Sequence, residues 1–211
     1  MDQILLYIHI IAGSMSLISG SIILSLKKGD QFHKLLGKLF FYSIAISMIF
    51  SVPISIQKSN VFLFIIAVWT LYMLITGLRS LKKINIKNVN AVDWLITLVM
   101  LFFGIILSGY GVFALIKGSL MGLVAIVFGA ISLLLVLSDI RFYRAEGKYK
   151  NQFLIIHIQR MVGAYIASIT AFVVVNNTVL PNVVAWLLPT IILVPLIIYW
   201  TKSWGVVKYI S

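Results

Sequence analysis

Residues 92–116 read VDWLITLVMLFFGIILSGYGVFALI, and Asp93 is the only charged residue among them. The hydrocarbon core of a bilayer is about 30 Å thick, and an α-helix crosses it with about 20 apolar residues. This stretch is therefore long and apolar enough to cross a membrane as one helix. Similar stretches lie on both sides of it, and the predicted spans are 4–26, 35–56, 61–78, 92–116, 120–137, 153–175 and 183–200.

The composition of the chain agrees with a membrane protein. Of its 211 residues 62% are hydrophobic and 10% are charged, and the mean hydropathy is +1.11, outside the range of soluble domains. The stretches are apolar on every face, whereas the strands of a membrane barrel would alternate. Because the gaps between them are short, we expect one integral membrane domain over 1–211, an all-α bundle of seven transmembrane helices.

The basic residues predict the orientation of this bundle. Lys and Arg gather in alternate gaps and in the tail, whereas the other gaps hold only Lys58 and Lys117. The gathered residues are Lys27, Lys28, Lys34, Lys38, Arg79, Lys82, Lys83, Lys87, Arg141, Arg144, Lys148, Lys150, Lys202 and Lys208. The positive-inside rule then places the N-terminus outside and the C-terminus in the cytoplasm. The net charge of +12 is expected to contact anionic lipid headgroups, with no nucleic-acid partner.

The chain has no cysteine, which excludes disulfides, thiolate zinc sites, iron–sulfur clusters, covalently attached haem and a cysteine nucleophile. It also lacks a phosphate-binding glycine loop and the G-x-S-x-G and H-E-x-x-H motifs. Any chemistry must therefore come from three His, five acidic residues, hydroxyl groups and a bound cofactor.

Ionisable side chains inside membrane spans are costly, so each one is a candidate functional residue. His9 lies toward the outer end of the first span. The others lie toward the cytoplasmic ends of the second, fourth, fifth and sixth spans, and they are His33, Asp93, Asp139, His157 and Arg160. The last span carries Pro189 and Pro195 and no ionisable residue before Lys202, so we expect it at the periphery.

Small residues recur at helical spacing beside these ionisable groups. The four stripes are His9, Gly13, Ser16 and Gly20; Asp93, Thr97, Gly104, Ser108 and Gly111; Gly118, Gly122, Ala125, Gly129, Ser132 and Asp139; and His157, Arg160, Ala164, Ser168 and Ala171. Small residues let membrane helices pack closely. The alternative interpretation is that they leave room for a flat or bulky ligand beside a His or Asp.

Three segments carry a resemblance to a known family. They are HIIAGS at 9–14, KGDQFHKLLGKLF at 28–40 and HIQRMVGAY at 157–165. Together they resemble an uncharacterised family of bacterial multi-pass membrane proteins, in which a His-x-x-x-Gly helix accompanies a Lys-Gly…His-Arg-x-x-Gly-Arg turn and a His-x-x-Arg-Met element. Lys34 and Lys38 stand where the family usually has Arg. The resemblance implies a bacterial cytoplasmic (inner) membrane location and no particular reaction.

A weaker resemblance is to transmembrane cytochromes b, in which His residues near glycines on neighbouring helices bind haem iron. It implies one haem b between His33 and His157, with Arg160 and nearby lysines as partners of the propionates. Asp93 and Asp139 would then support the site or handle protons. His9, the third candidate cofactor-binding histidine, lies across the membrane from the other two, and three His are fewer than two haems require, so a partner for His9 would have to come from a second copy of the chain.

Several alternatives use the same residues differently. His33, His157, Asp93 and Asp139 are a possible ligand set for a divalent metal that hydrolyses a lipid headgroup. In a structural interpretation, Asp139 or Asp93 pairs with Arg160 or Arg141. After haem binding and metal-dependent hydrolysis, a third class of function is that of a small proton-coupled transporter. A fourth is an accessory subunit without a cofactor, which holds lipids, membrane-protein partners or a second copy of the chain.

Overall fold

The computed structural model describes residues 3–82, 89–144 and 151–204, and these residues form seven helices. The helices are α1 Gln3–Ser25, α2 Gln31–Gln57, α3 Val61–Leu81, α4 Ala91–Ile116, α5 Met121–Tyr143, α6 Gln152–Val175 and α7 Asn182–Trp204. All of them are long and apolar enough to cross a membrane, which confirms the seven predicted stretches. The largest difference from the prediction is at α5, which continues to Tyr143 instead of ending near 137.

Side-chain caps fix where three of the helices begin. Asp30 caps α2 by accepting a hydrogen bond from the His33 backbone N–H at 2.7 Å. Asn60 caps α3 through the Leu63 N–H. Asn90 and Asp93 form a reciprocal capping box at the start of α4. His33 and Asp93 therefore lie in the first turns of their helices.

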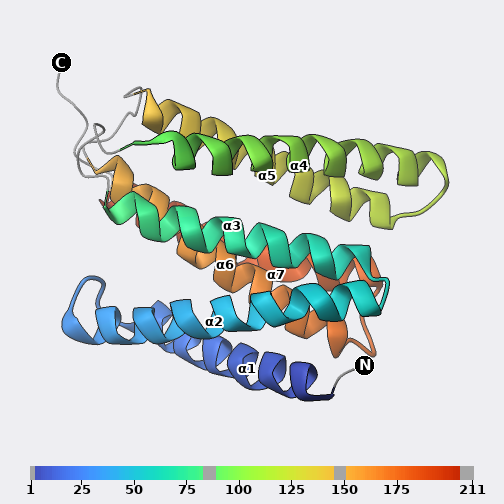
Figure 1. Ribbon diagram of the computed structural model, residues 1–211, viewed down its shortest axis with the longest axis horizontal. Helices are drawn as coiled ribbons and strands as arrows, with labels where there is room; N and C mark the ends of the chain where they lie inside the picture. The colour runs from blue at the N-terminus through green and yellow to red at the C-terminus, as the bar shows by residue number, and fades with distance from the viewer. Residues whose placement is uncertain (1–2, 83–88, 145–150, 205–211) are drawn as a thin grey trace.

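The helices form two hairpins around a central pair (Figure 1). α1 packs on α2, α4 packs on α5, and α3 packs on α6 between the hairpins. α7 packs on the outer side of α6, and only 17% of its most apolar window is buried, against 50% for α6. This agrees with the predicted peripheral place of the last span.

The small residues of α4 and α5 are packing residues. A Cβ atom on Gly111 would lie 2.7 Å from the carbonyl oxygen of Gly122, so the two backbones touch at this point. Gly104 meets Ser132 and Leu133 in the same way, at 3.1 Å. On these two helices the close-packing interpretation is confirmed, and no space for a ligand remains between them at these positions.

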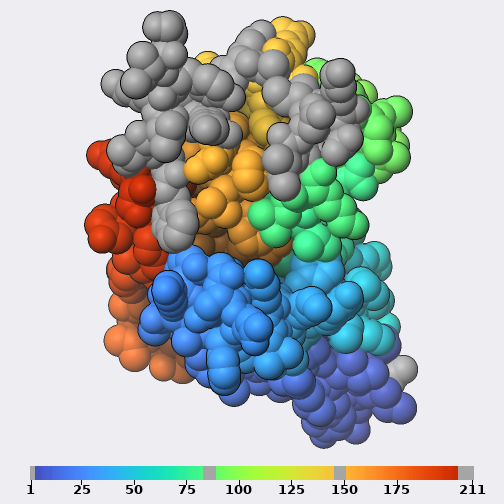
Figure 2. All heavy atoms as spheres, turned by 90° about the vertical axis from the view of Figure 1, so that its left-hand side faces the viewer, coloured from blue at the N-terminus to red at the C-terminus, as the bar shows by residue number. Residues whose placement is uncertain are grey.

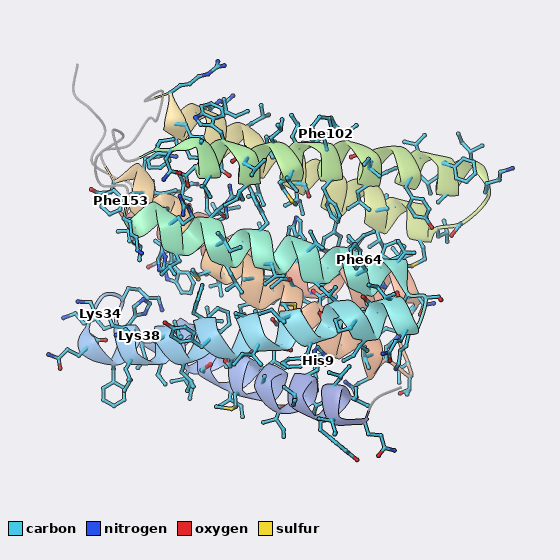
Figure 3. The ribbon with its side chains drawn as sticks, in the orientation of Figure 1. His9, Lys34, Lys38, Phe64, Phe102 and Phe153 are labelled. Atoms are coloured by element: carbon cyan, nitrogen blue, oxygen red, sulfur yellow. The ribbon has the colours of Figure 1, made fainter. Side chains whose placement is uncertain are left out.

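One end of the bundle carries most of the basic side chains that the structure describes. We call it the basic end, and its members are Lys27, Lys28, Lys34, Lys38, Arg79, Lys82, Arg141, Arg144 and Lys202. Figure 2 views the molecule onto this end, and Figure 3 shows Lys34 and Lys38 there, with His9 toward the opposite end. Lys83, Lys87, Lys148, Lys150 and Lys208, which also entered the predicted orientation, lie outside the described residues.

Candidate functional site

The polar residues of the basic end separate into two groups. The first, which we call the closed cluster, consists of Tyr72, Thr97, Asp139, Tyr143 and Arg160. The second, which we call the histidine pocket, is a cavity lined by His33 and His157 among others. The two groups lie on opposite sides of the contact between α3 and α6.

An ion pair between α5 and α6 is the centre of the closed cluster. Arg160 Nη2 donates to Asp139 Oδ1 at 2.6 Å and to the Leu135 carbonyl oxygen at 2.8 Å. The Tyr72 hydroxyl donates to the other carboxylate oxygen at 2.5 Å, and the guanidinium lies 5.2 Å from the Tyr72 ring centre. The Arg160 side chain is 0% exposed and that of Asp139 is 2% exposed, so the pair is sealed from solvent.

Two residues near the end of the bundle complete the closed cluster. Thr97 on α4 donates to Asp139 Oδ2 at 3.5 Å and lies 3.2 Å from the Tyr143 hydroxyl. Side chains from α3, α4, α5 and α6 thus meet at one carboxylate. Removing one partner from a buried ion pair leaves an uncompensated charge and costs about 3–5 kcal/mol. The arrangement accounts for Asp139 and Arg160 as residues that hold the α4–α5 hairpin to the central pair.

Asp93 has a separate structural role. Its side chain accepts hydrogen bonds from Arg79 Nε at 2.6 Å and from the Asn90 backbone N–H at 3.0 Å. Arg79 also donates to the Asn90 side chain. Asp93 therefore caps α4 and ties it to the end of α3.

The histidine pocket lies at the basic end, between α1, α2, α3, α6 and α7. In Figure 1 the α1–α2 hairpin diverges from α3 and α6 toward this end. Its volume is about 690 Å³, within the range of small-molecule and cofactor sites. The walls are largely apolar and include Ile23, Leu24, Phe40, Leu78, Leu154 and Met161. Lys28, Lys34, Lys38 and Lys82 also line it, and none of the described lining residues is acidic.

His157 is held firmly in this pocket. Its Nδ1 lies 3.0 Å from the carbonyl oxygen of Gly77 on α3. Gly77 is itself pressed against α6, since a Cβ atom there would lie 2.8 Å from Cβ of Arg160. With the proton on Nδ1 donated to this carbonyl, Nε2 keeps its lone pair for a partner in the pocket.

His33 reaches the same pocket from the first turn of α2. Its Nδ1 is buried and has no hydrogen-bond partner in the described structure. Two imidazoles, one from α2 and one from α6, therefore line one cavity.

Gly37 leaves open space beside His33. It lies one turn further along α2 and lines the pocket, and a Cβ atom on it would meet nothing within 4 Å. Gly20 differs, since a Cβ atom there would lie 2.5 Å from the Tyr165 ring. The interpretation that a small residue leaves room for a ligand beside a His therefore fits Gly37, which the predicted stripes did not include. The signal was present as a His-x-x-x-Gly spacing from His33, the same spacing as that from His9 to Gly13.

Lys28, a basic residue of the pocket, is bound to the end of α1. Its Nζ donates to the carbonyl oxygens of Ile23, Leu24 and Leu26 at 2.7–3.0 Å, which satisfies the end of α1. It also lies 4.5 Å from the Trp200 ring centre, and burial lowers the pKa of its amine. Lys34 and Lys38 are exposed and make no described ion pair, so they are the pocket cations that remain available to an anion.

The structure brings together only some of the residues singled out from the sequence. His33 and His157 share a pocket. Arg160, expected to anchor the anionic groups of a ligand, instead bonds Asp139, so the predicted structural pairing of these two is confirmed. His9 lies between α1 and α2, where its Nδ1 is 2.9 Å from the Ser47 carbonyl oxygen.

The four predicted metal ligands do not assemble. His33 and His157 line the pocket, Asp93 pairs with Arg79, and Asp139 is bound in the closed cluster. Within residues 3–82, 89–144 and 151–204, no group of three or more His, Asp or Glu side chains is placed to hold a metal ion. The reason is geometric, because the carboxylates and the imidazoles face opposite sides of the α3–α6 contact.

No family model, no curated protein and no solved structure matches this chain. The resemblance to an uncharacterised bacterial membrane family stays a prediction, as does the weaker one to cytochromes b. The functional argument therefore rests on the geometry of the two groups at the basic end.

Proposed function

We propose that this chain is a multi-pass protein of the bacterial cytoplasmic membrane that binds one haem b in the histidine pocket and serves a redox role. His33 and His157 are the residues that would hold the haem iron. The observation that carries it is the convergence of two imidazoles, from α2 and α6, on one largely apolar cavity of about 690 Å³.

The two imidazoles and the lining residues of the pocket fit a haem b. A haem-binding imidazole usually donates its second ring N–H to a carbonyl or carboxylate, and the Nδ1 contact of His157 with Gly77 has this form. His33 and the open space beside Gly37 mark the other side of the cavity. Haem b is flat and apolar and carries two carboxylates, which match apolar walls and lysines with no acidic residue among the described lining residues.

Each part of the pocket would have a definite task. His157 and His33 would hold the iron, and the walls around Phe40, Leu154 and Met161 would exclude water. Lys34 and Lys38 would neutralise the propionates, the role that the sequence suggests for Arg160 and nearby lysines. When bound, the haem would supply one-electron transfer at the basic end of the bundle.

We also infer that the basic end faces the cytoplasm, because its described Lys and Arg side chains far outnumber Lys58 and Lys117 at the other end. The chain has no cysteine, so single cysteines report orientation without background. In intact cells a membrane-impermeant maleimide should label Ser119→Cys, at the α4–α5 turn, and spare Ser203→Cys, near the end of α7. Labelling of Ser203→Cys with protection of Ser119→Cys would show that the basic end faces outward.

The test of haem binding is a reduced-minus-oxidised absorption spectrum of detergent-purified protein from cells supplied with a haem precursor. We expect a sharp α-band and a shifted Soret band, with equimolar haem. His9→Ala is the matched control and should leave the spectrum unchanged, because His9 lies outside the pocket. A flat spectrum, before and after titration with hemin, would end the proposal.

A second candidate is a non-enzymatic membrane subunit that holds an anionic lipid in the same pocket. The exposed Lys34 and Lys38 beside apolar walls favour it. It predicts that a phospholipid with a net negative headgroup copurifies with the protein and is lost from the double variant Lys34→Gln/Lys38→Gln. Mass spectrometry of the detergent-purified protein distinguishes this outcome from bound haem.

A further inference from the structure

We infer that the two histidines of the pocket have unequal roles, so that His157 anchors the haem while His33 is an exchangeable ligand that a small neutral molecule can replace. This inference rests on the proposed haem binding and adds a ligand class to it. The class consists of small diatomic or heterocyclic molecules that bind ferrous haem, with carbon monoxide as the probe.

The surroundings of His157 are rigid. Its Nδ1 contacts the Gly77 carbonyl oxygen, and Gly77 is packed directly against α6. Nearly two turns further along α6, Gly163 is pressed against Met73 of α3, where a Cβ atom would lie 2.6 Å from the sulfur. The backbone that carries His157 and the group that orients its ring therefore belong to one tightly packed helix pair.

The surroundings of His33 differ on each of these points. It lies in the first turn of α2, and its neighbours Gln31, Phe32, Lys34 and Leu35 are all exposed. The turn before it contains Gly29 with a φ of +88°, and nothing lies within 4 Å of a Cβ atom built there. No described group accepts a hydrogen bond from its Nδ1.

This asymmetry has a consequence for ligand exchange. Loss of the hydrogen bond that orients a metal-bound imidazole typically weakens metal affinity about 10–100-fold. His157 has such a bond and His33 has none, so the bond from iron to His33 should be the weaker of the two. With haem bound, carbon monoxide would take the place of the His33 imidazole: one iron–nitrogen bond would be exchanged for one iron–carbon bond, both ligands are neutral and no electron would be transferred. The open space beside Gly37 gives the displaced ring room to turn aside.

The first experiment compares three variants of the full chain, His33→Ala, His157→Ala and His9→Ala, by hemin titration and by the haem content of purified protein. We expect His157→Ala to lose haem and His33→Ala to keep it with at least about 10-fold tighter binding than His157→Ala. The spectrum of His33→Ala should become that of five-coordinate haem, and His9→Ala should match the unmodified chain. Equal loss of haem from both pocket variants would overturn the inference.

The second experiment uses the unmodified chain, so it does not depend on whether His157→Ala folds. Carbon monoxide is added to dithionite-reduced protein and the Soret band is followed. A saturable shift, with recovery of the original spectrum on photolysis, is the expected result. A reduced haem spectrum that carbon monoxide leaves unchanged would overturn the unequal roles while leaving haem binding intact. Protein that takes up no hemin would overturn both.

Discussion

The closed cluster and the histidine pocket lie at the same end of the bundle, yet they differ in whether their charged groups have partners of opposite charge. In the closed cluster Asp139 is opposed by a guanidinium and bound by two hydroxyls. In the pocket, lysines gather without an acidic lining residue, and one imidazole nitrogen is buried without a partner. Arg160 also keeps two buried nitrogens, Nε and Nη1, without a hydrogen-bond partner, so the two groups differ in charge balance and not in unsatisfied atoms. Opposite charges are paired in the closed cluster, whereas the lysines around the pocket have no acidic residue among its described lining residues, which favours a ligand with anionic groups.

The largest expected effect on stability comes from breaking the ion pair of the closed cluster. Asp139→Ala leaves Arg160 buried without its counter-charge, so the free energy of unfolding should fall by about 3–5 kcal/mol. Chemical denaturation in detergent measures it. The double variant Asp139→Leu/Arg160→Met removes both charges and should recover most of the loss, because apolar replacements of buried pairs are often neutral or stabilising.

The same variants also sharpen the comparison between the two groups. If the closed cluster is purely structural, the folded double variant should bind hemin like the unmodified chain. Loss of haem from a stably folded double variant would show that Asp139 and Arg160 act on the pocket, contrary to the separation described above.

The next largest effect is a difference in stability between the same substitution at two glycines of the pocket. Gly20→Ala forces a methyl group against the Tyr165 ring, which should cost about 1–3 kcal/mol in stability. Gly37→Ala meets no neighbour and should stabilise the free protein by up to about 1 kcal/mol through helix propensity. Thermal denaturation without ligand separates the two. A destabilised Gly37→Ala would mean that the space beside His33 is not open.

A smaller effect concerns the exposed lysines. Lys34→Gln and Lys38→Gln should each weaken hemin binding between about 1.4-fold and five-fold, the range of an exposed ion pair, and less at high salt. Lys58→Gln and Lys117→Gln, at the opposite end, are the matched controls. An equal loss in the controls would assign the effect to net charge.

The sequence predicted the helices well because a helix that crosses a bilayer needs a long run of apolar residues, and such a run is visible in the sequence itself. About 20 apolar residues between polar gaps define a span regardless of its neighbours. The errors lie at helix ends, where α5 continues through Asp139 and Arg141 to Tyr143. There the hydropathy falls, while the packing of Phe142 and the bonds of Asp139 keep the helix intact.

The candidate site was harder to predict because it depends on which face each residue presents. His157 and Arg160 are three residues apart on α6 and were expected to serve one ligand. Instead, Arg160 points to α5 and His157 lines the pocket beside α2 and α3. Sequence spacing places two side chains on a helix, but the neighbour that each one meets follows from how the helices pack.

The smallest expected effect separates Lys28 from the other pocket lysines. Burial lowers the pKa of its amine in the folded protein below the ordinary value of about 10.4 in the unfolded chain. Between these two values the unfolded state binds more protons than the folded state, so stability should rise with pH through this window. Below the folded-state pKa both states are protonated and the contribution is constant. Lys28→Met removes this group, so the difference in denaturation midpoint between the two proteins should shift in favour of the unmodified chain as the pH rises through the window. A difference that stays constant would mean that the amine titrates alike in both states, and that its three carbonyl contacts compensate for its burial.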